Sequence, residues 1–242
     1  MGRIYQNIVK ASNNQEQQLA ILIDPDKLAI DKLPLLFTKI NATRITHVFV
    51  GGSVVKAGIM DGYVSKIKTL TSLPLLIFPG DVTQITENSD ALLFLSLISG
   101  RNPEYLISKQ VEAVKKLKGM NLEIIPTAYL LIENGKETAV ERVSNTEPMS
   151  RRNIQLISDT AKAGELLGMK LAYLEAGSGA VLPINSEIIT EVKKCLKIPL
   201  IVGGGIKTIE QLNTAYDAGA DLVVVGTAIE ENESFLQKLT KE

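Results

Sequence analysis

Nearly continuous apolar runs alternate along the chain with longer segments in which apolar residues recur every three or four positions. The first pattern predicts strands buried on both faces, and the second predicts helices that bury one face. The predicted strands cover residues 19–23, 47–50, 74–78, 91–97, 123–131, 171–174, 199–202 and 222–225. The predicted helices cover residues 32–40, 54–70, 82–88, 103–118, 154–167, 184–196, 209–218 and 231–239. This alternation favours a parallel sheet.

Eight strand–helix units in 242 residues predict a closed (β/α)8 (TIM) barrel that forms a single domain over residues 1–242. An open, doubly wound sheet is the alternative. Its dinucleotide-binding version is disfavoured, because no Gly-x-Gly-x-x-Gly follows the first strand.

Two segments fall outside this repeat. Residues 4–12 precede the first strand and are predicted to cap the floor of the barrel. The fifth strand runs on as residues 129–143 around Asn134-Gly135, a pair that favours tight two-residue turns. We predict a β-hairpin here that rises above the barrel mouth as a wall or lid, followed by a polar loop to Ser150. The alternative is a loop without a role at the mouth.

Composition narrows the class of protein. With 26 basic and 27 acidic residues, the chain lacks the excess of positive charge expected of a nucleic-acid binder. The single cysteine, Cys195, excludes an intramolecular disulfide, and the helical pattern around it predicts a core position. We see no signal peptide and no apolar run of membrane-spanning length, so we expect a cytoplasmic protein. Because His47 is the only histidine, acid–base chemistry falls to carboxylates, tyrosines or lysines.

The strongest chemical signal follows the sixth predicted strand. That strand delivers Tyr173 and Glu175 and then opens into Gly177-Ser178-Gly179. Glycines let backbone N–H groups approach and cradle an anion, and a carboxylate beside them can move a proton. The alternative is an ordinary turn after a strand, with a solvated glutamate.

Glycine turns also follow the seventh and eighth strands, as Gly203-Gly204-Gly205 and Gly226-Thr227. In TIM barrels these two positions form the usual phosphate site, because backbone N–H groups and a helix N-terminus face the anion. Together with Gly177–Gly179 they predict a phosphorylated substrate. The alternative is three tight turns that bind nothing.

Asp24 and Ser53 follow the first and second strands, across the mouth from the glycine turns. A carboxylate and a hydroxyl are hard oxygen ligands that suit Mg²⁺, which commonly takes one or two protein ligands and completes its shell with water and substrate phosphate. An aspartate before a proline can also simply cap a turn. Two anion sites at one mouth suit the joining of a phosphorylated acceptor to a diphosphate donor.

In this order, the motifs resemble those of the geranylgeranylglyceryl phosphate synthase family, which includes the heptaprenylglyceryl phosphate synthases. The resemblance covers nearly the whole chain, and its most specific part is the string Tyr173-Leu174-Glu175-Ala176-Gly177-Ser178-Gly179. Supporting motifs are Leu22-Ile23-Asp24-Pro25-Asp26-Lys27, Val50-Gly51-Gly52-Ser53, Pro126-Thr127-Ala128-Tyr129, Gly203-Gly204-Gly205-Ile206-Lys207 and Val225-Gly226-Thr227.

The resemblance implies a prenyltransferase that makes an ether-linked prenylglyceryl phosphate for ether-lipid synthesis. It implies that the phosphate of sn-glycerol 1-phosphate binds Gly177, Ser178, Gly179, Gly204, Gly205, Gly226 and Thr227. It also implies that the run Tyr173-Leu174-Glu175-Ala176 binds the acceptor, with Tyr173 and Glu175 holding the glycerol hydroxyls. Mg²⁺ on Asp24 and Ser53 would bind the diphosphate of a polyprenyl donor. Glu175 would then accept the proton of the attacking hydroxyl.

One departure bears on the substrate. Some bacterial members carry a lysine two residues before the metal aspartate, where this chain has Leu22. This places the sequence nearer the branch that typically uses geranylgeranyl diphosphate. The tail requires an apolar groove, for which Ile98, Tyr129 and the expected hairpin are candidate walls.

The sequence leaves two rival functions open. A sugar-phosphate isomerase or synthase would share the phosphate site without needing a metal, and a phosphate sensor would bind without turnover. We also expect a homo-oligomer, because the apolar pair Leu166-Leu167 lies on a helix face, and no more than transient contact with a membrane.

Overall fold

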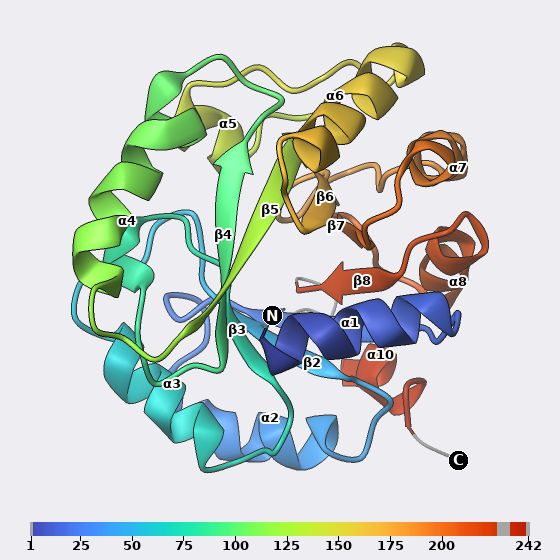
Figure 1. Ribbon diagram of the computed structural model, residues 1–242. Helices are drawn as coiled ribbons and strands as arrows, with labels where there is room; N and C mark the ends of the chain where they lie inside the picture. Colours follow the sequence, from blue (N-terminus) through green and yellow to red (C-terminus); the bar gives the residue numbers. More distant parts are fainter. Residues whose placement is uncertain (1, 227–232, 241–242) are drawn as a thin grey trace.

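Eight parallel strands close into a barrel in the computed structural model, which describes residues 2–226 and 233–240 (Figure 1). The strands are β1 (Gln18–Ile23), β2 (His47–Val50), β3 (Leu75–Ile77), β4 (Ala91–Leu97), β5 (Glu123–Leu131), β6 (Leu171–Glu175), β7 (Leu200–Gly203) and β8 (Leu222–Val225). Each strand pairs with the next, and β1 also pairs with β8, Ala20 opposite Val224. The predicted (β/α)8 barrel is therefore confirmed, and the open sheet is excluded.

Helices surround the barrel on its outer side (Figure 1). They are α2 (Leu33–Ile40), α3 (Met60–Lys68), α4 (Lys109–Leu117), α5 (Ala139–Ser144), α6 (Ile154–Leu166), α7 (Ser186–Cys195), α8 (Ile209–Asp217) and α10 (Glu233–Gln237), with short turns η1 (Ile30–Lys32), η2 (Val82–Gln84) and η3 (Glu104–Ser108). The helix predicted over residues 82–88 is reduced to η2, and the one predicted over 54–70 begins only at Met60. Of the described helices, none has the length and apolar character needed to cross a membrane.

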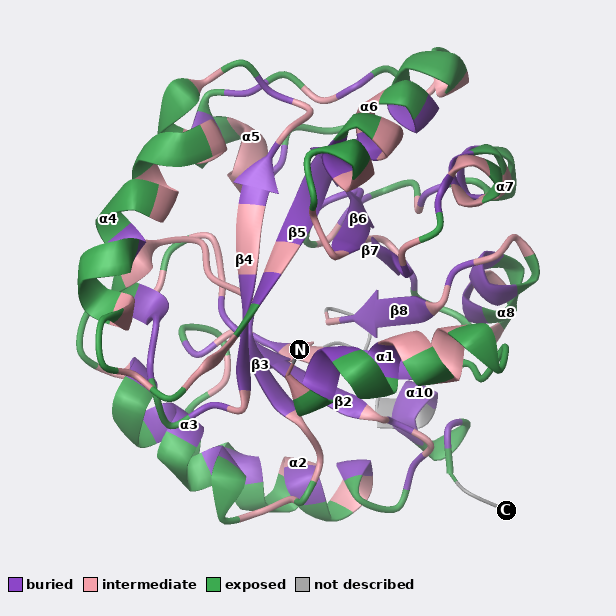
Figure 2. Ribbon diagram, in the orientation of Figure 1, coloured by how far each residue is buried: buried purple, intermediate pink, exposed green. Residues whose placement is uncertain are grey.

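Apolar side chains fill two separate layers. One lies inside the barrel and includes Ala20, Phe49 and Leu76, while the other lies between strands and helices and includes Ile21, Val48 and Ile77. Successive strand residues point to opposite faces, so a strand buried on both sides must be apolar throughout. Figure 2 shows the strands buried along most of their length and the helices buried only on the side that faces them.

The first helix, α1 (Arg3–Asn13), closes the floor of the barrel, as residues 4–12 predict. Ile4, Tyr5 and Ile8 are buried in the layer inside the barrel. The backbone N–H groups of Ile4 and Tyr5 each donate to the Glu123 carboxylate, at 2.8 Å. A carboxylate at a helix N-terminus satisfies N–H groups that have no partner within the helix. The first residue of β5 thereby fixes α1 across the end of the barrel that faces the viewer in Figure 1.

The predicted β-hairpin after the fifth strand is wrong. The chain leaves β5, turns at Gly135 and forms the short helix α5. Thr138 and Glu141 form a capping box there: the Thr138 hydroxyl accepts from the Glu141 N–H at 3.3 Å, and the Glu141 carboxylate accepts from the Thr138 N–H at 2.7 Å. This reciprocal cap stabilises a helix start and outweighs the turn preference of Asn134-Gly135.

The exposed pair Leu166 and Leu167 ends α6, with 77% and 76% of each residue accessible. This exposure agrees with the apolar helix face that the sequence predicts at Leu166-Leu167. The oligomeric state inferred from it stays a prediction.

His47 provides a test of the buried barrel floor. It is 5% exposed, and burial lowers its pKa to about 4. Between about pH 6.5 and pH 4 the unfolded chain carries a proton on this histidine that the folded protein does not. We therefore expect the free energy of unfolding to fall by about 3 kcal/mol from this group as the pH is lowered through that window. Urea denaturation across the window measures it.

The matched control is His47→Gln, which keeps a polar side chain but does not titrate. Carboxylates contribute equally to both proteins, so the difference between the two pH profiles isolates the histidine. Identical profiles would show that the pKa of His47 is the same in the folded and unfolded states, so that burial does not lower it.

Candidate active site at the barrel mouth

Glu175 is the last residue of β6 and is almost fully buried, with 5% of the residue exposed. The Gly177 N–H donates to its Oε1 at 2.5 Å, and the hydroxyls of Tyr173 and Tyr129 donate to the same carboxylate. Burial raises the pKa of Glu175, while these donors pull it in the opposite direction. The carboxylate is thus a stronger base than an exposed glutamate, held in a fixed direction.

Three aromatic rings surround this carboxylate inside the barrel. Phe78 stacks on Tyr173 with ring centroids 5.3 Å apart, and Tyr129 meets both rings edge-on at 5.8 Å and 5.4 Å. Burial and the nearby Glu175 charge raise the pKa of Tyr129 and Tyr173 well above the usual value. Both phenols therefore stay protonated and act as hydrogen-bond donors. The sequence singled out Tyr173 but gave Tyr129 no role at Glu175.

The space for these side chains exists because β7 ends in glycine. A Cβ on Gly203 would lie 2.2 Å from the Tyr173 hydroxyl oxygen, and one on Gly204 would lie 2.7 Å from Glu175 Oε1. Gly204 also approaches the backbone after β6, since its Cβ would lie 2.6 Å from the Gly177 nitrogen. The glycine turns after β6 and β7 are therefore adjacent, as the sequence predicts.

The turns themselves adopt backbone conformations that favour glycine. Gly177, Gly179, Gly204 and Gly205 have φ of +98°, +66°, +86° and +73°. In this left-handed region the peptide planes turn so that successive N–H groups can face one anion. Gly226, after β8, lines the same cavity. Thr227 lies outside the described residues.

Apart from Gly177, whose N–H donates to Glu175, the predicted site residues that the structure describes divide into two groups. The polar cavity at the mouth is lined by Asp24, Ser53, Tyr173, Glu175, Ser178, Gly179, Gly204, Gly205 and Gly226, among others. Leu174 and Ala176 instead point outward and are buried between the barrel and the helices. These two residues can reach a ligand only through their backbone.

Asp24 and Ser53 follow β1 and β2 and line the same cavity. The Asp26 N–H donates to Asp24 Oδ1 at 3.1 Å, and burial raises the pKa of the Asp24 carboxyl. A Cβ on Gly52 would lie 2.8 Å from both carboxylate oxygens, so glycine is required for Asp24 to reach this place. The described residues hold no cluster of three or more His, Cys, Asp or Glu side chains suited to a metal. One desolvated carboxylate and one hydroxyl fit a Mg²⁺ ion that takes its remaining ligands from water and substrate.

Gln84 holds together the loops after β2 and β3, the first of which carries Ser53. It is 1% exposed, and its amide bridges two loops: Oε1 accepts from the N–H groups of Gly52 at 3.3 Å and Gly80 at 3.2 Å, and Nε2 donates to the Gly52 carbonyl at 2.7 Å. Buried amides are rigid when all of their bonds are made. The backbone next to Ser53 is therefore held in place by the Gln84 amide.

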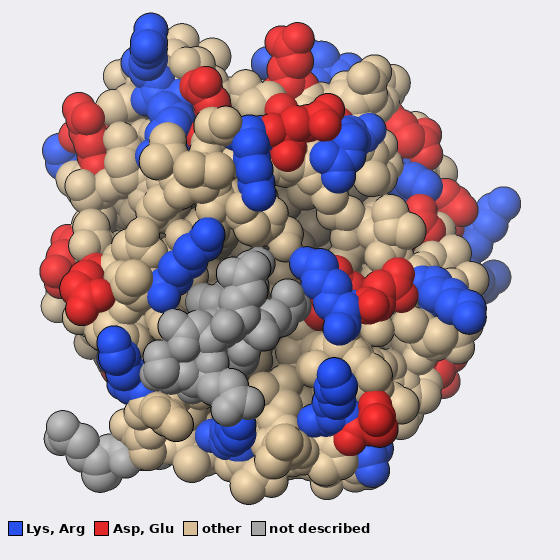
Figure 3. All heavy atoms as spheres, turned by 180° about the vertical axis from the view of Figure 1, so that it is seen from behind, with Lys and Arg blue, Asp and Glu red and all other residues tan. Residues whose placement is uncertain are grey.

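Basic side chains around the mouth were missed by sequence reasoning. Lys27, Lys136, Arg142 and Lys207 all line the polar cavity. Figure 3 shows this face, on which Lys and Arg side chains border a central hollow. Lys27 and Lys207 stand within the motifs singled out above, but their spacing alone does not show that they turn toward the mouth.

An apolar cleft opens beside the polar cavity. Its lining includes Leu92, Leu95, Leu97, Tyr105, Ala113 and Val143, and it shares Gly52, Ser53, Phe78, Tyr129 and Val140 with the polar cavity. Tyr129 is thus confirmed as a cleft wall, whereas Ile98 is not among its lining residues. Helix α5 supplies the wall that was expected from a hairpin.

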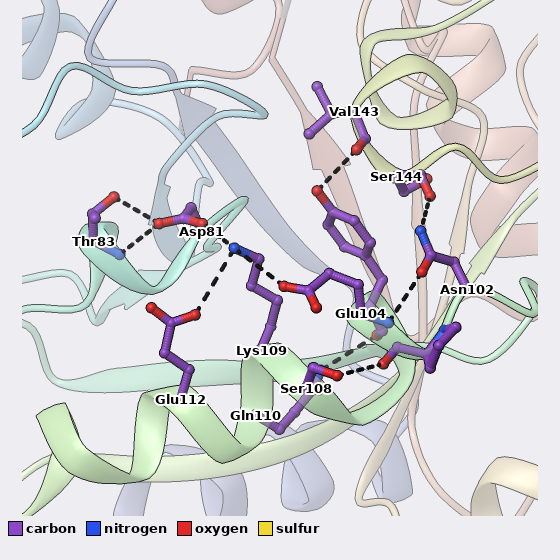
Figure 4. Close-up of polar contacts among 12 residues, drawn as sticks. Asp81, Thr83, Asn102, Glu104, Ser108, Lys109, Gln110, Glu112, Val143 and Ser144 are labelled. Carbon is purple, nitrogen blue, oxygen red and sulfur yellow. Dashed lines mark hydrogen bonds and ion pairs between the residues drawn. The ribbon is translucent and has the colours of Figure 1, made fainter.

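Hydrogen bonds from η3 and from Asn102 before it hold α5 over this cleft (Figure 4). The Tyr105 hydroxyl donates to the Val143 carbonyl at 2.9 Å, and the Asn102 amide donates to the Ser144 carbonyl at 2.7 Å. On the other side, the Lys109 ammonium lies 2.7 Å from Asp81 Oδ2 and joins α4 to the loop after β3. These polar contacts therefore close two sides of the apolar cleft.

The mouth of this (β/α)8 barrel joins glycine turns suited to an anion, a buried carboxylate and an apolar cleft, which defines a class of barrel able to hold a phosphorylated group beside a hydrocarbon. The sequence places the chain within one family of that class. Residues 12–242 match the model of the PcrB family, and the chain belongs to it.

Relatives of known name cover nearly the full chain. A geranylgeranylglyceryl phosphate synthase of Flavobacterium johnsoniae is 53% identical over 232 residues, 96% of each chain. One from Thermococcus gammatolerans is 40% identical over 92% of this chain and 87% of its own. The crystal structure of (S)-3-O-geranylgeranylglyceryl phosphate synthase from Thermoplasma acidophilum, in complex with sn-glycerol-1-phosphate, matches with a TM-score of 0.92 at 32% identity, over 99% of this chain and 96% of that one.

Gly203→Ala tests the packing that positions Tyr173. The new methyl group would overlap the Tyr173 hydroxyl. We expect the free energy of unfolding to fall by about 1–3 kcal/mol, as for other overpacked cores. Urea denaturation followed by circular dichroism measures this.

The matched control is Gly62→Ala. Gly62 lies within α3, and a Cβ there would meet nothing within 4 Å. This variant should be as stable as the natural protein or more stable by about 0.5–1 kcal/mol. Equal stability of both variants would mean that Tyr173 does not fill the space above Gly203.

Proposed function

We propose that this protein transfers a geranylgeranyl group from its diphosphate to the 3-hydroxyl of sn-glycerol 1-phosphate. The product is an ether-linked geranylgeranylglyceryl phosphate, and diphosphate is released. One observation carries the proposal: the polar cavity and the apolar cleft share Phe78, Tyr129 and Val140, so one mouth can receive a phosphorylated head and a hydrocarbon tail together. The names of the relatives support the same reaction.

The acceptor phosphate would bind the glycine turns after β6, β7 and β8. Ser178, Gly179, Gly204, Gly205 and Gly226 offer backbone N–H groups there, whereas the Gly177 N–H donates to Glu175 and Gly177 shapes the turn. Thr227, outside the described residues, belongs to the same proposed set. The relative from Thermoplasma acidophilum is described in complex with sn-glycerol-1-phosphate. This bound ligand and the overlap in fold support the assignment of the cradle to glycerol phosphate.

Glu175 is proposed as the base, with Tyr173 holding the glycerol hydroxyls beside it. The prenyl C–O bond to diphosphate breaks, and the glycerol 3-oxygen forms a new C–O bond with that carbon. The hydroxyl proton passes to the Glu175 carboxylate, and diphosphate leaves with the bonding electron pair. Because burial raises the pKa of Glu175, this carboxylate accepts a proton more readily than an exposed one.

Asp24 and Ser53 are proposed to hold Mg²⁺ against the diphosphate. The ion supplies charge neutralisation for a leaving group that departs as an anion. Asp24 contributes one carboxylate that is bonded to the Asp26 N–H and thereby oriented. Gln84 keeps the Gly52 backbone, and with it Ser53, in a fixed position relative to Asp24.

The hydrocarbon tail would lie in the apolar cleft between Tyr129, Leu95 and Val143. Such a cleft also argues against the rival function, because a sugar-phosphate isomerase has no hydrocarbon to bury. Water is kept from the junction by the three packed rings of Phe78, Tyr129 and Tyr173. Exclusion of water favours transfer to glycerol over hydrolysis of the donor.

A turnover assay tests the function directly. Purified protein, Mg²⁺, labelled sn-glycerol 1-phosphate and prenyl diphosphates of increasing length are mixed, and label is counted in an organic extract. We expect transfer, with geranylgeranyl diphosphate the preferred donor. Absence of transfer from every donor by folded protein that binds glycerol phosphate would contradict the proposal and favour the sugar-phosphate rival.

Glu175→Gln is the control that separates binding from chemistry. Glutamine keeps the size of the side chain but cannot take up the proton. We expect kcat to fall by about a hundredfold or more, with sn-glycerol 1-phosphate still bound in calorimetry. A kcat near that of the natural protein would remove Glu175 as the base.

Asp24→Asn tests the metal site. An amide oxygen binds Mg²⁺ more weakly than a carboxylate, so half-maximal activity should require about tenfold or more Mg²⁺. The measurement is a Mg²⁺ titration of prenyl transfer after treatment with a chelator, with Asp31→Asn, which lies in η1, as the control. Identical titrations of the Asp24 variant and the natural protein would exclude Asp24 as a ligand.

A further inference from the structure

Two lysines reach the Gly177–Gly179 turn from separate loops. Lys27, after β1, donates from Nζ to Ser178 Oγ at 3.1 Å, and the two residues are 151 positions apart in the sequence. Lys136 precedes α5, and a Cβ built on Gly179 would lie 3.5 Å from its Nζ. Both side chains line the polar cavity. One turn is thus approached from both sides by an ammonium group.

The charges at the mouth show why these ammonium groups matter. Glycine turns offer only backbone dipoles, whereas a phosphate monoester carries between one and a half and two negative charges, roughly, near pH 7. The carboxylates of Asp24 and Glu175 line the same cavity and would repel that anion. Arg142 lines it as well, but its guanidinium lies 3.3 Å from the Glu137 carboxylate, which offsets its charge. A compensating charge must come from lysine.

Lys27 occupies a place between the two anion sites. Its Nζ lies 3.8 Å from Asp24 Oδ2, on the metal side, and 3.1 Å from Ser178 Oγ, on the phosphate side. The same ammonium therefore weakens the repulsion that Asp24 exerts on a phosphate. The Ser178 hydroxyl accepts from Lys27 at the turn where a phosphate oxygen could accept a stronger, charge-assisted bond.

We infer that Lys27 and Lys136 form a two-sided clamp that binds the phosphate of the acceptor on the Gly177–Gly179 turn. This inference rests on the proposed function, since it identifies the groups that select a phosphorylated acceptor for that reaction. Lys27 closes the turn from the β1 side and Lys136 from the α5 side.

Calorimetric titration with sn-glycerol 1-phosphate tests the clamp in Lys27→Met and Lys136→Met. Each change removes one charge and keeps much of the side-chain length, and Lys27 and Lys136 are both exposed, which favours normal folding. We expect each variant to bind about ten- to a hundredfold more weakly, the range for a hydrogen bond to a charged group. Kinetically, KM for glycerol phosphate should rise while kcat at saturation stays within about twofold, as expected when only binding is lost.

Two controls separate charge at the turn from charge in general. Lys66→Met removes an exposed lysine of α3 that lines neither cavity and should leave binding unchanged. Lys27→Arg keeps the charge and should retain most of the affinity. Inorganic phosphate, titrated into the same set, should show the same order of affinities, because the clamp recognises phosphate rather than glycerol.

The outcomes distinguish this inference from the proposed function. Weaker binding in both methionine variants supports the clamp, even if the natural protein transfers no prenyl group in the turnover assay. Unchanged affinity in either variant, alongside normal prenyl transfer by the natural protein, overturns the clamp and leaves the function standing. Absence of binding of both glycerol phosphate and inorganic phosphate by the natural protein overturns the clamp as well.

Discussion

The buried carboxylate of Glu175 is the constraint around which the mouth is built. A desolvated charge is costly unless donors surround it, and here the Gly177 N–H and two tyrosine hydroxyls supply them. Those donors require β7 to end without side chains at Gly203 and Gly204. Because these two positions lack side chains, the backbone segment after β6 and the one after β7 can also lie close together. One buried carboxylate therefore accounts for the phenols, the glycines and the close approach of the turns after β6 and β7.

Much of this fold could be predicted from sequence, because a strand covered on both faces must be apolar throughout. The runs at His47–Val50, Ala91–Leu97 and Glu123–Leu131 give strand ends that agree with the structure. The hairpin prediction failed for a local reason. The chain bends at Gly135, where φ is +91°, but Asn134 lacks the positive φ of a two-residue type I′ turn. The reciprocal cap of Thr138 and Glu141 then directs the chain into a helix. The capping box, which makes two hydrogen bonds, therefore outweighs the turn preference of Asn134-Gly135.

The candidate site was predictable where chemistry follows strand ends. Asp24, Ser53, Glu175 and Gly204 come together because the C-terminal ends of barrel strands converge. Other residues of the site were not predictable in this way. Tyr129 in β5, Gln84 in η2 and Lys136 before α5 depend on the direction in which each side chain points, which the order of residues does not encode. Ile98 shows the converse, since it follows a strand at the mouth yet does not line the cleft.

The two cavities draw on different stretches of the chain. Apart from shared residues, the apolar cleft is lined only from within residues 79–144, whereas the glycine turns of the anion cradle follow β6, β7 and β8. The apolar lining and these turns can therefore change independently. Substitutions among the apolar residues of the cleft can remodel the pocket for the hydrocarbon while the glycine turns keep their shape. Descendants of one ancestral barrel can thus diverge in membrane-lipid chemistry without rebuilding their catalytic centre.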